Sequence, residues 1–188
     1  MLSNYLTLIP LISSLAIASP IISPRGAGSR IQSISNPYSC VTVQGGTISN
    51  DGDVALSSCF SETDTFAAEQ RWSVIGSSSQ AEQQIDLILN TEWCLDGNND
   101  SQGEWGIKPK ISKCDYQNNQ QQHWAVEPVN SNDGSNYFRF KVNGLCLDVE
   151  KDSGPGYSKP YPQSKALQLW ECHDDDHPDA QQQYFTLI

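Results

Sequence analysis

The chain contains Gln70-Arg71-Trp72, Gln122-His123-Trp124 and Gln183-Tyr184-Phe185, three copies of one pattern. In each copy a glutamine precedes a large aromatic residue by two positions. The aromatic residue of each copy lies 13, 10 and 13 residues, respectively, after a cysteine. Self-similarity at a fixed period indicates a repeat architecture, so the chain of 188 residues is predicted to consist of three units.

The cysteines recur with the same period. The first cysteines of the three units are 54 and then 52 residues apart, at Cys40, Cys94 and Cys146. The second cysteines follow 19, 20 and 26 residues later, at Cys59, Cys114 and Cys172. Two independent markers in one order predict three repeats of about 50 residues, at about 30–84, 85–135 and 136–188.

Short strands fit each repeat better than helices. Residues 137–142 are rich in aromatic and branched side chains, Asn143-Gly144 favours a tight hairpin turn, and residues 145–149 alternate with a period of two. No segment carries a sustained helical period with capping residues. The sequence therefore predicts an all-β chain with little α-helix.

The amino-terminal segment is typical of exported proteins. Residues 1–18 carry no charged side chain and end on Ala16-Ile17-Ala18, which predicts a secretory signal peptide. Pro10 interrupts the apolar run, which is shorter than the roughly 20 residues that cross a bilayer, so we expect no membrane span. Residues 19–29 are rich in Pro, Gly and Ser and predict a flexible lead-in.

Charge and missing motifs exclude several functions. Lys and Arg number 11 against 22 Asp and Glu, and the net charge of −11 argues against nucleic acid as a partner, because a phosphate backbone repels it. The sequence has no GxSxG, no HExxH, no phosphate-binding glycine loop and no dinucleotide fingerprint. We therefore expect neither an enzyme nor a cofactor.

These features resemble the ricin-B-type lectins, which are β-trefoils with three Gln-x-Trp motifs. The resemblance rests on Cys94-Leu95-Asp96, on Cys146-Leu147-Asp148, on residues 167–172 and on the three Gln-x-aromatic segments. It implies a single β-trefoil domain over residues 30–188 with pseudo-threefold symmetry. Burial of Trp72, Trp124 and Phe185 in a shared core is expected. The glutamines Gln70, Gln122 and Gln183 are expected to bond loop backbone that lacks a sheet partner.

The resemblance also implies one disulfide per repeat. The bridges would be Cys40–Cys59, Cys94–Cys114 and Cys146–Cys172, each closing a loop of roughly 20 residues and contributing a few kcal/mol. A metal cluster is the alternative. The chain has no CxxC pair and three histidines, so bridges are favoured and no metal is expected. The run of His and Asp at residues 173–177 fits a solvated loop.

Sugar-binding members of the family place an Asp just after the first cysteine, an aromatic residue before the second, and polar residues at the Gln-x-Trp motif. A pyranose has one face of C–H groups and a rim of hydroxyls, so it needs a flat π surface and an ionised acceptor. In the third repeat the resemblance assigns these roles to Asp148, Gln168, Trp170, Gln182 and Gln183. Gln182 stands where the family usually has Asn.

The second repeat matches this pattern less well. Its polar positions are kept by Asp96, Gln121 and Gln122. Ser112 occupies the stacking position and Lys110 the position of the third-repeat glutamine, so a weaker site is expected. Trp105 is close in sequence and is a candidate to compensate for the missing ring.

The first repeat has lost the pattern, because Thr42 replaces the Asp and small residues, Ala55 and Ser57, precede the second cysteine. The third repeat carries an insertion at residues 153–162, between its Asp and its Trp. This insertion either offers Tyr157 or Tyr161 as a second aromatic wall of the third-repeat pocket or blocks that pocket.

The sequence therefore favours a secreted, extracellular lectin whose partners are glycans or glycoproteins. A preference for galactose or N-acetylgalactosamine is implied by the resemblance. A single shallow site binds with about −4 kcal/mol, so several sites or an oligomer would be needed for avidity. The alternatives are a secreted trefoil interaction protein, such as a protease inhibitor or an effector, and a polysaccharide-binding module. Asn99-Asp100-Ser101 is a possible N-glycosylation site.

Overall fold

The computed structural model describes residues 28–75, 81–98, 105–130, 134–157 and 159–188. Its strands are β1 (Ile31–Ser33), β2 (Ser39–Val43), β3 (Gly52–Ser58), β4 (Trp72–Ser73), β5 (Glu82–Gln83), β6 (Asp86–Leu87), β7 (Asn90–Asp96), β8 (Lys110–Lys113), β9 (Trp124–Asn130), β10 (Asn136–Val142), β11 (Leu145–Val149), β12 (Lys165–Glu171) and β13 (Phe185–Leu187). Three short 3₁₀ helices are present, η1 (Ala67–Gln70), η2 (Gln120–Gln122) and η3 (Ala180–Gln183). The all-β prediction is confirmed.

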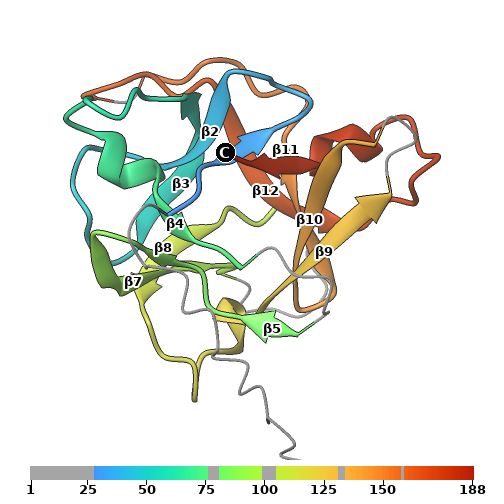
Figure 1. Ribbon diagram of the computed structural model, residues 1–188, viewed down its shortest axis with the longest axis horizontal. Coiled ribbons are helices and arrows are strands. Elements are labelled where there is room, and N and C mark those ends of the chain that lie inside the picture. The colour runs from blue at the N-terminus through green and yellow to red at the C-terminus, as the bar shows by residue number, and fades with distance from the viewer. Residues whose placement is uncertain (1–27, 76–80, 99–104, 131–133, 158) are drawn as a thin grey trace, which may run out of the picture.

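The first and last strands of the repeats close into a barrel (Figure 1). Strand β1 pairs with β13, β13 with β10, β10 with β9, β9 with β5, and β6 with β4. A bridge between Ser29 and Trp72 joins the residues before β1 to β4 and completes the ring. All these pairings are antiparallel. Because β5 leads directly along the chain into β6, the described strands form a closed ring.

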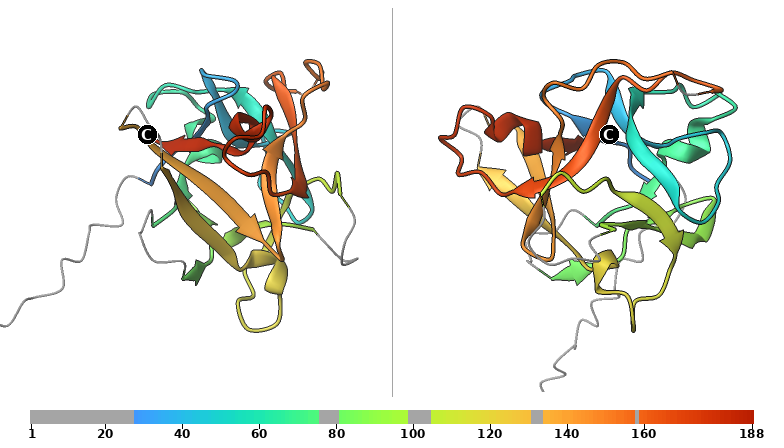
Figure 2. Two further views of the ribbon diagram at one scale, coloured as in Figure 1. Left: turned by 90° about the vertical axis from the view of Figure 1, so that its right-hand side faces the viewer. Right: turned by 180° about the vertical axis from the view of Figure 1, so that it is seen from behind.

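Three hairpins, β2–β3, β7–β8 and β11–β12, cover one end of the barrel. Neighbouring hairpins are joined by the pairs Ala55–Ala166, Asp53–Lys110 and Ile107–Leu169. The first repeat (blue to cyan), the second (green to yellow) and the third (orange to red) occupy three sectors around one axis in both Figure 1 and Figure 2. The predicted β-trefoil is confirmed.

Several pairings lie at the turns and at the edges of the repeats. The predicted hairpin around Asn143-Gly144 is present, with Val142 opposite Leu145. Strand β5 lies just before the approximate start of the second repeat, and its residues Glu82 and Gln83 pair with β9. Ser29, expected in the lead-in, already pairs with Trp72. Residues 1–18 and the rest of the lead-in up to residue 27 lie outside the described residues.

No helix within the described ranges has the length and apolar character needed to cross a membrane.

The core forms where the Gln-x-aromatic segments enter the barrel. Each 3₁₀ helix ends on the glutamine, and the next strand begins on the aromatic residue. Trp72, Trp124 and Phe185 are fully buried. The indole N–H of Trp72 donates to the carbonyl of Val41 at 3.0 Å, and that of Trp124 donates to the corresponding carbonyl in the second repeat at 2.8 Å. Phe185 instead packs edge-to-face on Phe140, with ring centroids 5.7 Å apart.

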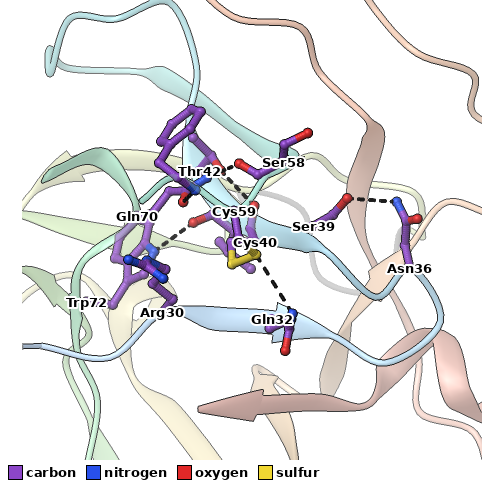
Figure 3. Close-up of a disulfide and its surroundings, with 12 residues drawn as sticks. Arg30, Gln32, Asn36, Ser39, Cys40, Thr42, Ser58, Cys59, Gln70 and Trp72 are labelled. Carbon is purple, nitrogen blue, oxygen red and sulfur yellow. Dashed lines mark hydrogen bonds between the residues drawn. A yellow bond between two sulfur atoms is a disulfide. The ribbon is translucent and has the colours of Figure 1, made fainter. Parts of the chain in front are cut away.

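One disulfide lies in each repeat, Cys40–Cys59, Cys94–Cys114 and Cys146–Cys172. Each bridge ties the first strand of its repeat's hairpin to the residue that follows the second strand, with Cα atoms 5.0 Å apart. Figure 3 shows the first of them beside Gln70 and Trp72. The six cysteines are all used in these bridges.

Candidate functional site

The glutamine of each Gln-x-aromatic segment holds the loop around the second cysteine. In the first repeat the side-chain oxygen of Gln70 accepts from the backbone N–H of Phe60 at 2.7 Å. Its amide nitrogen donates to the carbonyl of Ser58 at 2.9 Å and to the hydroxyl of Thr42 at 2.8 Å (Figure 3). These contacts satisfy backbone groups on both sides of Cys59, as the sequence predicts.

The same three contacts recur in the other repeats, and in those the third partner is a carboxylate. The amide of Gln183 accepts from His173 N–H at 2.9 Å, donates to the carbonyl of Glu171 at 2.8 Å, and donates to Asp148 Oδ2 at 3.2 Å. Gln122 contacts Asp96 Oδ2 at 3.4 Å. Both glutamines are fully buried, so they orient the carboxylates from behind.

An open cavity of about 380 Å³ lies on the third repeat, between β11, β12 and η3. Four of the five residues that the sequence assigned to a third-repeat site line it, Asp148, Gln168, Trp170 and Gln182. The fifth, Gln183, lies behind the carboxylate. Sequence reasoning missed the other lining residues, Glu150, Lys151, Asp152, His173 and Asp179.

Asp148 is almost completely buried, with 2% of its surface exposed. Its Oδ1 accepts from Gln168 Nε2 at 2.9 Å and its Oδ2 from Gln183 Nε2 at 3.2 Å. Burial raises the pKa of Asp148 above its ordinary value, while these two hydrogen bonds favour the ionised form. Since a carboxylate oxygen has two lone pairs, these two amides do not use the whole accepting capacity of the carboxylate.

The rim of the cavity is an ion pair. The ammonium of Lys151 lies 2.7 Å from Asp179 Oδ1, and Gln182 Nε2 donates to the same oxygen at 3.1 Å. The hydrogen bond between them raises the pKa of Lys151 and lowers the pKa of Asp179. No periodic signal in the sequence links these two surface residues, which are 28 positions apart.

Trp105 contacts the third repeat, although it belongs to the second. Its ring centroid lies 5.6 Å from that of Trp170, with the planes tilted by 43°. The backbone beside it is fixed to β12, since Gly106 N–H donates to the carbonyl of Leu169 at 2.8 Å. Trp105 therefore does not replace the missing ring of the second repeat, because that repeat's loop is held against β12.

In the second repeat the chain itself surrounds the carboxylate of Asp96. Its Oδ1 accepts from the backbone N–H of Asn98 at 2.7 Å, and its Oδ2 accepts from Asn119 Nδ2 at 2.7 Å and from the hydroxyl of Ser112. The side-chain oxygen of Gln121 accepts from Asn143. The three residues expected at this site lie together, but Asp96 has fewer lone pairs left for a ligand than Asp148.

The insertion of the third repeat lies over the first repeat (Figure 2, right). Tyr161 is buried, with its ring 4.9 Å from that of Phe60 and 5.2 Å from that of Phe66. Its hydroxyl donates to the carboxylate of Glu69, which precedes the first Gln-x-aromatic segment as Gln182 precedes the third. The insertion therefore fills the position in the first repeat that corresponds to the third-repeat cavity.

The two tyrosines proposed as cavity walls lie elsewhere. Tyr161 packs in the first repeat, and Tyr157 is fully exposed and is not among the residues that line the third-repeat cavity. A Cβ on Gly46 would approach Pro160 Cδ to 2.5 Å, so the missing side chain at this position makes room for the insertion. The insertion therefore neither supplies a second aromatic wall to the third-repeat cavity nor blocks it, because Tyr161 packs on the first repeat.

A larger hollow of about 670 Å³ lies beside Ser29, Tyr137 and Leu187. Its described lining contains no carboxylate and no tryptophan. It therefore lacks the pairing of an ionised acceptor with an aromatic platform that distinguishes the third-repeat cavity.

The histidines of the acidic loop stack on each other. The rings of His173 and His177 are 4.0 Å apart, and Asp175 pairs with Arg139 at 2.9 Å. Within the described ranges no group of three or more His, Cys, Asp or Glu is placed to hold a metal ion. Asn99, the possible glycosylation site, lies outside the described residues.

Known proteins share this architecture. The structure is similar to a designed threefold-symmetric protein, ThreeFoil, at 16% identity over 85% of this chain and 96% of that one, with a TM-score of 0.59. It is also similar to the C-half of an earthworm R-type lectin solved in complex with GalNAc, at 16% identity over 86% and 97% of the two chains, with a TM-score of 0.54. At these identities the similarity shows the fold alone.

A mosquitocidal holotoxin shows the same fold within a longer protein. It matches 85% of this chain and 16% of its own, at 13% identity and a TM-score of 0.60. No curated protein gives a sequence match to the chain. The family model described as the ricin-type β-trefoil lectin domain matches residues 27–161, which end before β12. The chain belongs to the ricin-type β-trefoil lectin domain family.

Proposed function

We propose that the protein is a non-enzymatic lectin that binds glycans in the third-repeat cavity. Membership of the lectin domain family supports carbohydrate binding in general. The observation that carries the site is the meeting of the Asp148 carboxylate and the half-buried Trp170 ring in one open cavity.

Each side chain then has a distinct role. The free lone pairs of Asp148 accept hydrogen bonds from sugar hydroxyls, and the Trp170 ring stacks on the C–H face of the pyranose. The amides of Gln168 and Gln182 contact further hydroxyls at the edges of the cavity. Gln183 acts as a positioning residue, since it is buried and reaches only the carboxylate and the backbone.

We assign a galactose-type sugar, galactose or N-acetylgalactosamine, as the ligand. The earthworm lectin that shares the fold was solved in complex with GalNAc, which supports this assignment. An open cavity that contacts one sugar ring binds with a Kd on the order of mM, about −4 kcal/mol. Clustering several copies on a multivalent surface, or forming an oligomer, raises the avidity.

We place the protein outside the cell. The three disulfides persist in oxidising compartments, which supports export. In this proposal residues 1–18 are a signal peptide, residues 19–29 are a lead-in, residues 30–188 are the trefoil domain, and Asn99 is a glycan acceptor.

The test is retention on immobilised galactose together with a broad glycan array. The wild type is expected to be retained and to elute with free galactose, whereas Asp148→Ala and Trp170→Ala are expected to flow through. Tyr157→Ala is the matched control, because it removes a fully exposed aromatic side chain elsewhere on the third repeat. A blank array and no retention of the wild type would overturn the proposal, and a pull-down that free sugar does not compete would then identify a protein-binding trefoil.

A further inference from the structure

An apolar surface adjoins the third-repeat cavity and comes from a different repeat. Trp105 is 56% exposed, and its ring lies 5.6 Å from that of the half-buried Trp170. Together the two indoles extend the aromatic platform beyond the cavity lining. An exposed indole beside a half-buried one, at the edge of a polar cavity, indicates a binding surface. Contiguous apolar surface on a soluble protein often marks an interaction site, whereas single scattered apolar side chains do not.

The position of this surface is fixed by the fold. Gly106 N–H donates to the carbonyl of Leu169 at 2.8 Å, and Leu169 N–H donates to the carbonyl of Ile107 at 2.7 Å. Leu169 is fully buried and adjoins Trp170 in β12. The backbone on the carboxyl side of Trp105 is therefore held to the strand that carries the stacking ring, and little ordering entropy is lost on binding.

The charge of the cavity restricts the ligand. Four carboxylates line it, Asp148, Glu150, Asp152 and Asp179. The one lysine, Lys151, is already paired with Asp179. An anionic sugar would meet this excess of negative charge, whereas a neutral sugar supplies the hydroxyl donors that carboxylates accept.

We propose that Trp105 forms a second stacking subsite, so that the third-repeat site takes two linked pyranose units of a neutral glycan. The first unit lies on Trp170 beside Asp148, and the second lies on Trp105. The separation of the two rings is comparable with the length of one pyranose and its glycosidic oxygen, so adjacent units of one chain can reach both. This inference rests on the proposed lectin function and deepens it.

The experiment compares the whole chain with Trp105→Ala and Trp105→Phe on a glycan array. The array carries galactose, N-acetylgalactosamine, glucose and N-acetylglucosamine, each as the monosaccharide and as a β-linked disaccharide, together with sialylated disaccharides. The wild type is expected to bind the neutral disaccharides at least fivefold more tightly than the matching monosaccharides. Trp105→Ala is expected to keep the monosaccharide affinity and lose that gain, and Trp105→Phe to restore part of it.

Two controls separate this inference from the lectin function. Trp170→Ala is expected to lose both monosaccharide and disaccharide binding, and Tyr157→Ala to change neither. Monosaccharide binding with no disaccharide gain, or a gain that Trp105→Ala preserves, overturns the second subsite and leaves the lectin function intact. Sialylated disaccharides bound as well as neutral ones overturn the neutral-glycan assignment. A blank array for the wild type overturns the function and the subsite together.

Discussion

The hydroxyl of Tyr161, in the insertion of the third repeat, donates a hydrogen bond to the carboxylate of Glu69 in the first repeat. The insertion thus covers a repeat other than its own. It fills the place where the first repeat would form a cavity and leaves the cavity of the third repeat open. The pseudo-threefold symmetry of the fold is therefore broken at the surface where the third repeat forms its cavity.

Tyr161→Phe tests how strongly this contact holds the insertion. Removing the hydroxyl removes the donor to the buried carboxylate of Glu69 and the short contact of the same oxygen with the carbonyl of Val43. We expect the free energy of unfolding to fall by about 1–2 kcal/mol, measured by urea denaturation. Tyr157→Phe, at a fully exposed position, is expected to stay within about 0.5 kcal/mol of the wild type. Equal losses in the two variants would contradict the anchoring role.

Gln183→Ala tests the glutamine behind the candidate site. The substitution removes three hydrogen bonds, those to His173, Glu171 and Asp148. We expect a loss of about 2–4 kcal/mol in the free energy of unfolding, because buried partners are left unsatisfied.

The same variant is expected to bind galactose more weakly, since Asp148 loses one of the two amides that orient it. Gln181→Ala is the matched control, because Gln181 lies in the same 3₁₀ helix and is exposed. Unfolding curves and galactose titrations of the two variants provide the check. A Gln183→Ala protein as stable as Gln181→Ala would rule out the positioning role.

The sequence allowed the fold to be predicted because the features that build it repeat along the chain. Buried aromatic residues such as Trp72 and Trp124 and the paired cysteines recur at one period, so each copy supports the others. The candidate site was predicted in part for the same reason. Asp148 and Trp170 occupy positions set by the repeat, and the structure places both in one cavity.

The remaining features depend on contacts between repeats, which an alignment of repeats does not contain. Trp105 packs against the third repeat and Tyr161 against the first, whereas the sequence order assigns each to its own repeat. The pair Lys151–Asp179 is a contact between charged side chains on two loops. Such surface pairs leave no periodic signal in the sequence.

Disulfide removal is expected to weaken the fold strongly. The Cys146–Cys172 bridge closes a loop of 26 residues, and a loop of this size contributes about 3.5 kcal/mol on the chain-entropy estimate. The double substitution Cys146→Ala with Cys172→Ala should lower the free energy of unfolding by about that amount in urea denaturation. Reduction of all three bridges should unfold most of the protein, because typical domain stabilities are about 5–15 kcal/mol. An unchanged unfolding midpoint after reduction, with six free thiols counted, would contradict this prediction.

Sugar binding is expected to weaken as the pH falls. The proposed role of Asp148 needs the ionised carboxylate, and burial raises its pKa above the ordinary value of 3.8. As the pH falls, protonation of Asp148 therefore begins to weaken binding at a higher pH than protonation of an exposed Asp would. Below the pKa of Asp148 the affinity should fall about tenfold for each pH unit, measured by galactose titration from pH 7 to pH 4.

This loss of affinity does not reflect unfolding, because protonation of Asp148 weakens sugar binding but stabilises the folded state. A carboxyl whose folded-state pKa is raised contributes stability that is fully present below its unfolded pKa and is lost as the pH rises through the folded value. Burial raises the pKa of both Asp148 and Glu69, so protonating them favours the native state. Tryptophan fluorescence should therefore stay native-like while the affinity falls. The variant Asp148→Asn has no titrating carboxyl at this position, so it should bind galactose weakly at pH 7 and with an affinity that does not change with pH. If its affinity still followed the pH profile of the wild type, the pH dependence would belong to another group.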